Sequence, residues 1–229
     1  MGRPLPHWPR LTHDQAREVA TRTLRVLRDS NRTLDIVAVE ELVSQTQLRA
    51  LLRAGVFDAE DGAALLAERP SLPDTDLDPL RRLPDTTLGG AFVRFLDENG
   101  LDLTLLRQPA PYTDDADAAF LLQRIRQSHD LWHTLLGLGT AGHEEILVHS
   151  FSLAQTGFPS SVMIVLLGGV KHLVAERRWR DLHPGIARAY QLGRRASWLL
   201  PVYWERYWEQ PLREIRTRFG ITPYAHAMA

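Results

Sequence analysis

Apolar residues recur along most of this chain at intervals of three and four positions, the spacing that brings side chains onto one face of an α-helix. Almost no segment alternates polar and apolar residues with the period of two that is typical of a β-strand. The pattern therefore predicts an all-α fold. We expect helices over residues 12–28, 34–54, 58–68, 88–99, 114–136, 144–155, 162–170, 185–209 and 212–219.

Local signals support the ends of these helices. Thr12 and Gln15 have the spacing of a capping box at the start of the first helix. Repeated prolines between residues 70 and 87 predict a loop with at most short turns. A glycine-rich turn should let the helix after it run back antiparallel to the helix before it; its glycines are Gly137, Gly139 and Gly142.

The expected helices form a single domain over residues 1–229, with an N-terminal helical region over about 10–70 and a second region over about 80–224. We expect antiparallel helices around an apolar cavity. The run 162–170 is predicted to be a buried helix, either lining that cavity or simply belonging to the core. A belt of aromatic residues either contacts a membrane or partner or packs between helices; it comprises Trp198, Tyr203, Trp204, Tyr207 and Trp208.

Composition narrows the possible functions. The chain has 229 residues with 27 lysine and arginine against 28 acidic residues, so no strong field indicates nucleic acid as a partner. It has no cysteine, which excludes disulfides, iron–sulfur clusters and thiolate zinc sites. The start has no apolar targeting segment, and the longest apolar run is too short to span a bilayer. We expect a cytoplasmic location, with contact at the inner face of the membrane as the alternative.

One group of residues has the spacing of a metal site. His129 and His133 lie one helical turn apart, with Asp130 between them in projection. Glu145 should face them from the returning helix, although His143 and Glu144 crowd the same turn. Two imidazoles and two carboxylates suit a divalent metal, most of all zinc, with iron, manganese or magnesium as alternatives.

The same residues have other interpretations: the spacing can be accidental, or it can belong to another class of metal enzyme. With nine histidines in the chain, a His-Asp-x-x-His spacing can arise by chance. A zincin protease is disfavoured, because Asp130 stands where that motif has a longer glutamate. Phosphohydrolases of the His-Asp type need further ligands, for which we find no convincing set. The remaining histidines are expected to be ordinary surface or core residues: His7, His13, His149, His172, His183 and His226.

Further recognisable segments lie before and after the four candidate metal ligands. They are Arg124-x-Arg126 before His129, Ala154-Gln155-Thr156-Gly157-x-Pro159, Leu83-Pro84-x-x-Thr87-Leu88-Gly89 and Val202-Tyr203-Trp204-Glu205-x-x-Trp208-Glu209-x-Pro211-Leu212. With the eleven residues between His133 and Glu145, they closely resemble the ubiquinone (coenzyme Q) biosynthesis protein four family. The likeness covers residues 80–224. It implies an all-helical protein, usually dimeric, whose metal is bound by His129, Asp130, His133 and Glu145 beside a cavity for a polyprenyl chain.

The resemblance also implies a function in ubiquinone-type biosynthesis. One role is a metal-dependent enzyme of lyase type that replaces the C1 carboxyl of a prenylated 4-hydroxybenzoate ring by hydroxyl. Arg124 and Arg126 could hold that carboxylate by bidentate bonds, or they could be solvated or paired with the aspartates at 114–117. The alternatives are a non-catalytic scaffold that binds a prenyl lipid and organises other biosynthetic enzymes, and a relative that serves a natural-product pathway. Relatives tend to carry lysine and glutamate where this chain has His149 and Ser152, which makes the substrate less certain than the metal.

Overall fold

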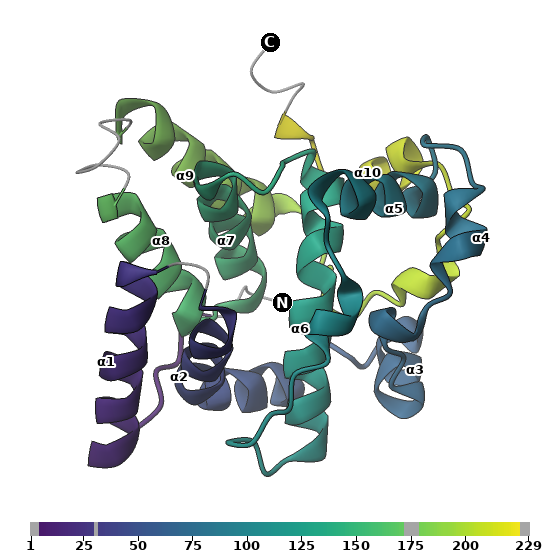
Figure 1. The fold of residues 1–229 in the computed structure, drawn as a ribbon. Coiled ribbons are helices and arrows are strands. Elements are labelled where there is room, and N and C mark those ends of the chain that lie inside the picture. Colours follow the sequence, from purple (N-terminus) through teal and green to yellow (C-terminus); the bar gives the residue numbers. More distant parts are fainter. Residues whose placement is uncertain (1–4, 30–31, 172–178, 225–229) are drawn as a thin grey trace.

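The computed structural model describes residues 5–29, 32–171 and 179–224. These residues form helices, joined by loops and short 3₁₀ segments (Figure 1). Among them no strand forms, and an isolated antiparallel bridge joins Thr87 to Pro211. The α-helices are α1 His13–Arg28, α2 Thr33–Arg53, α3 Glu60–Glu68, α4 Leu77–Arg81, α5 Leu88–Asn99, α6 Ala116–Leu136, α7 Gly142–Thr156, α8 Pro159–Lys171, α9 Trp179–Arg195 and α10 Leu212–Phe219. The 3₁₀ segments are η1 Leu72–Asp74, η2 Leu103–Leu106 and η4 Trp204–Arg206.

Helix α6 runs through the middle of the molecule (Figure 1). In this view α1, α2, α7, α8 and α9 lie to its left, and α3, α4, α5 and α10 lie to its right. The N-terminal half of α6 packs with α2 and α3 in one hydrophobic cluster, and its C-terminal half packs with α5, α7 and α9 in a second. Because α6 is covered on several sides, even its polar residues are largely buried and must find partners within the protein.

The start of α5 docks against the segment before α10. The backbone N–H of Leu88 donates to Gln210 at 2.9 Å, and that of Gly89 donates to Trp208 at 2.8 Å. Gly90 lies so close to the preceding turn that a Cβ there would stand 2.3 Å from the carbonyl oxygen of Pro84. Two of the segments that carry the family resemblance therefore meet each other and stabilise the fold.

The end of α9 corrects a prediction. The sequence predicted one helix over 185–209, but α9 ends at Arg195 and an irregular segment follows. The buried side chain of Gln155 replaces the helical hydrogen bonds there: its amide donates to Gly193 at 2.8 Å and accepts from the N–H of Leu199 at 3.0 Å. Pro201 is also unable to donate a helical hydrogen bond.

Helix α8 corrects a second prediction. The run 162–170 is helical as expected, but it is not fully buried, since Leu166 and Val170 are 62% and 57% exposed. The helix packs against α2, α7 and α9, which cover only part of its surface. Among the described residues, no helix is both long and apolar enough to cross a membrane.

The aromatic belt packs inside the protein. Trp204 is fully buried, and the ring of Trp208 stacks on Phe92 with centroids 5.6 Å apart. The hydroxyl groups of Tyr203 and Tyr207 donate to carboxylates of α3, at 2.6 and 2.7 Å. Helix packing accounts for Tyr203, Trp204, Tyr207 and Trp208, which are buried, and Trp198 is partly buried against the cluster that contains α2 and α3. Contact of the belt with a membrane or partner stays a prediction.

Candidate metal centre

The turn between α6 and α7 builds the site. Helix α6 ends at Leu136 and is capped by Gly137, whose positive φ of 65° allows the chain to reverse. Arg216 of α10 reinforces this end by donating to the carbonyl groups of Thr134 and Leu135 at 3.0 and 2.9 Å. Helix α7 then returns beside α6 (Figure 1), and Glu145 in its first turn faces the two histidines. The predicted antiparallel return is confirmed.

Three donor atoms converge between the helices. Nε2 of His129 lies 3.1 Å from Nε2 of His133 and 3.2 Å from Oε2 of Glu145, which is 3.5 Å from Nε2 of His133. Tetrahedral ligands about 2.0–2.1 Å from a zinc ion are separated by roughly 3.3 Å. The spacing and the chemistry of the donors therefore fit a divalent metal, and the three form a group within 4.8 Å of one another.

The surroundings of His133 suit the role of a metal ligand. Its Nδ1 lies 2.9 Å from the carbonyl oxygen of Gly139, an acceptor that requires the proton to be on Nδ1. Nε2 is then left with a free lone pair pointing at the cluster. The ring is almost fully buried and stacks on Phe95 with centroids 5.4 Å apart. His129 and Glu145 are more open, with side chains 25% and 34% exposed, so solvent or a ligand reaches the cluster from their side.

The charges in the cluster favour a cation. Burial opposes ionisation of Glu145, yet the hydrogen bond with His129 and the nearby ring of His133 outweigh it and hold its pKa well below the ordinary value. Burial likewise opposes protonation of His129, but Glu145 raises its pKa above the ordinary value. A metal held by His129, His133 and Glu145 would therefore compete with a proton for the same atoms.

The structure shows which of the three candidate ligands in the turn, His143, Glu144 and Glu145, joins the cluster. The carboxylate of Glu144 accepts hydrogen bonds from the N–H groups of Gly139 and Ala141, at 2.8 and 3.3 Å, so it stabilises the turn. His143 is exposed and lies outside the group of donor atoms. Glu145 is thus the acidic residue of the turn that joins the cluster.

Asp130, the fourth predicted ligand, lies beside this group but outside it. Burial raises the pKa of its carboxyl group, and the charges of His129 and His133 act in the opposite direction. These interactions place Asp130 in the electrostatic field of the cluster. Its carboxylate oxygen is not within 4.8 Å of all the other donors.

The two arginines predicted to hold a substrate carboxylate already hold protein carboxylates. Arg124 is fully buried, and its two terminal nitrogens lie 2.7 and 2.8 Å from the oxygens of Glu205. Arg126 donates to Glu40 at 2.6 Å and to the carbonyl of Val37 at 2.8 Å, which leaves its Nη1 without a partner. Neither pairs with the aspartates at 114–117. Both terminal nitrogens of Arg124 are engaged by Glu205, and its Nε has no partner.

His149 is a site residue that the sequence interpretation missed. Its ring lies 5.0 Å from that of His129, centroid to centroid, and one turn after Glu145 along α7. The spacing Glu145-x-x-x-His149 was the signal that could have identified it, because positions four apart share a helix face. Among the other histidines set aside, His7 contacts Gln47. His13 and His183 are exposed, and His172 and His226 lie outside the described residues.

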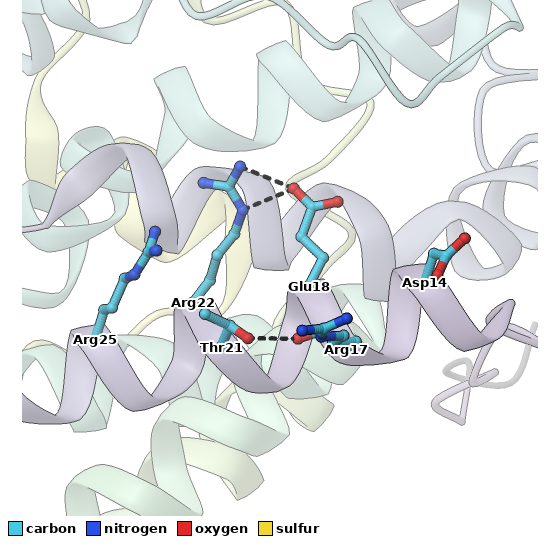
Figure 2. A pocket seen from close by; sticks show the side chains of 6 residues that line it. All are labelled: Asp14, Arg17, Glu18, Thr21, Arg22 and Arg25. Carbon is cyan, nitrogen blue, oxygen red and sulfur yellow. Dashed lines mark hydrogen bonds and ion pairs between the residues drawn. The ribbon is translucent and has the colours of Figure 1, made fainter.

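Two hollows in the surface lie away from the metal centre. One, of about 420 Å³, runs along α1, where Arg22 pairs with Glu18 and Thr21 bonds the carbonyl of Arg17 (Figure 2). The other, of about 480 Å³, lies between the segment after α3 and the first half of α6, and includes Arg69, Arg107 and Gln123. None of the donor residues lines either hollow. An apolar cavity beside the metal centre stays a prediction.

Comparisons with known proteins point to one family. Residues 6–225 match the family described as coenzyme Q (ubiquinone) biosynthesis protein Coq4. The mitochondrial ubiquinone biosynthesis protein COQ4 homologues of Bos taurus and Homo sapiens are 38% and 37% identical, over 82% of this chain and 71% of theirs. A crystal structure from Nostoc punctiforme, of a candidate ubiquinone biosynthesis protein, superimposes with a TM-score of 0.71 at 27% identity. It covers 90% of this chain and 97% of the other.

Proposed function

Because the chain belongs to the Coq4 family of ubiquinone biosynthesis proteins, we propose that it uses its metal centre to act on a prenylated aromatic ring of 4-hydroxybenzoate type. The observation that carries the proposal is the convergence of His129, His133 and Glu145 at distances that fit a divalent metal. Asp130, whose charge interacts with those of His129 and His133, would add a second carboxylate if its side chain joined the cluster. Zinc is our first choice of metal, with iron, manganese or magnesium as alternatives.

The proposed reaction replaces the C1 carboxyl of the ring by hydroxyl. The bond between the ring and the carboxyl carbon breaks, carbon dioxide leaves, and the ring gains an oxygen from water. Dioxygen accepts the two electrons and is released as hydrogen peroxide. The metal would supply a Lewis acid that neutralises the charge of ring oxygens.

The protein's own residues have supporting tasks in this reaction. His133 is held in one tautomer by Gly139, so its ring keeps a fixed direction. On its inner side the cluster is covered around His133, which is almost fully buried and stacks on the partly buried ring of Phe95, and this side would limit access of water. The open side at His129 and Glu145 admits the ring. Arg126, through its unpartnered Nη1, is the remaining candidate for holding the carboxylate.

Turnover of a synthetic prenylated 4-hydroxybenzoate tests the proposal. The purified protein is loaded in turn with zinc, iron and manganese and incubated with the ring under air, and carbon dioxide and the hydroxylated product are measured. We expect release of carbon dioxide that requires dioxygen and disappears in Glu145→Gln. Polyprenyl lipid that copurifies and survives unchanged with every metal would instead support the scaffold role. Membrane contact, a homodimer and partner enzymes stay predictions.

A further inference from the structure

A line of polar side chains continues from the metal centre along α7. Glu145, His149 and Ser152 are spaced by four and three residues, so they share one face of the helix. Glu145 belongs to the metal cluster, and His149 lies against the ring of His129 at 5.0 Å and 35°. Ser152 is one turn further on and 5% exposed. The polar site therefore extends beyond the three donor atoms.

Two atoms on this line have no hydrogen-bond partner. Nδ1 of His149 and the hydroxyl oxygen of Ser152 are both buried and unpaired. By contrast, the hydroxyl of Ser150 on the same helix donates to the carbonyl of Ile146 at 2.6 Å. Since a buried polar atom without a partner is destabilising, two such atoms beside a metal centre indicate partners that a ligand brings.

The chemistry of His149 limits what that ligand can be. The Nδ1 atom of His149 can donate or accept a hydrogen bond according to the tautomer of the ring, and the hydroxyl of Ser152 also donates and accepts. Such groups match a hydroxyl better than a carboxylate. His149 stands outside the group of metal-binding atoms, which places it beside the metal and not on it.

Building on the proposed function, we propose that His149 hydrogen-bonds a hydroxyl substituent of the aromatic ring, next to the ring oxygen that the metal binds. Ser152 extends this contact one turn further from the metal. The ligand class is an aromatic ring with two neighbouring oxygen substituents. His149 is then the residue that selects such rings over rings with a single hydroxyl.

Ligand binding to the cobalt(II)-loaded protein tests the proposal, because the visible absorption of cobalt reports on its ligands. Cobalt affinity is measured first, without any ring. 3,4-Dihydroxybenzoate and 4-hydroxybenzoate are then titrated into wild type, His149→Leu and Ser152→Ala. His143→Leu is the matched control for a histidine on α7, and Ser150→Ala is the control for a buried serine. The metal is the same in every protein, so its own preference for one ring cancels when ratios are compared.

We expect His149→Leu to keep its cobalt spectrum and its affinity for 4-hydroxybenzoate. Its preference for the dihydroxy ring should fall about tenfold, as for the loss of one hydrogen bond. Ser152→Ala should lose about threefold, and both controls should match wild type. His149→Gln, which keeps a donor and an acceptor, should regain part of the preference for the dihydroxy ring. If His149→Leu does not fold, His149→Gln is compared with wild type in its place.

Two results would overturn this assignment. The first is an unchanged preference in His149→Leu. The second is a changed cobalt spectrum or weaker cobalt binding in that variant without any ring, which would make His149 a metal ligand. A wild-type protein that binds no cobalt would instead overturn the proposed function on which the assignment rests, and this result is obtained before a ring is added.

Discussion

Arg124 is expected to stabilise the fold and not to bind a substrate. Its side chain is fully buried, its two terminal nitrogens bond Glu205 at 2.7 and 2.8 Å, and Glu205 is itself only 19% exposed. Arg124→Met keeps much of the apolar stem but leaves this carboxylate unpaired. Breaking a buried pair costs about 3–5 kcal/mol, and the partial exposure of Glu205 favours the lower end, about 3 kcal/mol. For a chain of this length, a loss of that size lowers Tm by roughly 6–12 °C.

Denaturant unfolding of wild type, Arg124→Met, Glu205→Gln and the double variant measures this cost. The double variant should lose less free energy of unfolding than the two single losses together, because each removes the same interaction. Arg81→Met is the control for an exposed pair: its Nη2 lies 3.0 Å from Asp97, and its loss should cost less than about 1 kcal/mol. The reasoning is refuted if Arg124→Met unfolds like wild type but no longer binds metal or ring.

Three further predictions concern the start of α5, the turn between α6 and α7, and the cluster of donor atoms. Gly90→Ala should lower the free energy of unfolding by about 2 kcal/mol in a denaturant titration, because its Cβ would overlap the backbone of Pro84. Glu145→Gln should abolish tight zinc binding in calorimetry, whereas Glu144→Gln should keep it and lose about 1 kcal/mol of stability with the bonds in the turn. Zinc affinity should fall about tenfold per pH unit below the raised pKa of His129, since zinc must displace one proton, and should level off above it. An affinity that does not change between pH 5 and 8 would contradict the competition between metal and proton.

The helices that the sequence predicts best have their boundary signals next to them in the chain. Thr87 accepts a hydrogen bond at the start of α5 and Gly100 ends it with a positive φ, and both limits of α5 were predicted to the residue. The end of α9 was not predicted, because it depends on a distant residue: Gln155 accepts a hydrogen bond from the N–H of Leu199, 44 positions further along the chain. Periodicity contains no information about such a contact.

The same distinction holds for the metal centre. His129 and His133 are four residues apart on one helix, and a short glycine turn returns Glu145, so local geometry was enough to bring these three together. The partner of Arg124 lies 81 positions away and could not be read from its neighbours. His149 was missed for another reason: its spacing from Glu145 was visible, but only the packing of α7 against α6 brings it to His129.

Metal content tests the central claim most directly. Wild type, His133→Ala and His143→Ala are purified without chelators, and bound metal is measured by elemental analysis together with protein concentration. His143 is the control because it is exposed, lies in the same turn and does not join the cluster. We predict about one divalent ion per chain in wild type and in His143→Ala, and little or none in His133→Ala. A wild-type protein without stoichiometric metal, or His133→Ala with the same content as wild type, would contradict the account.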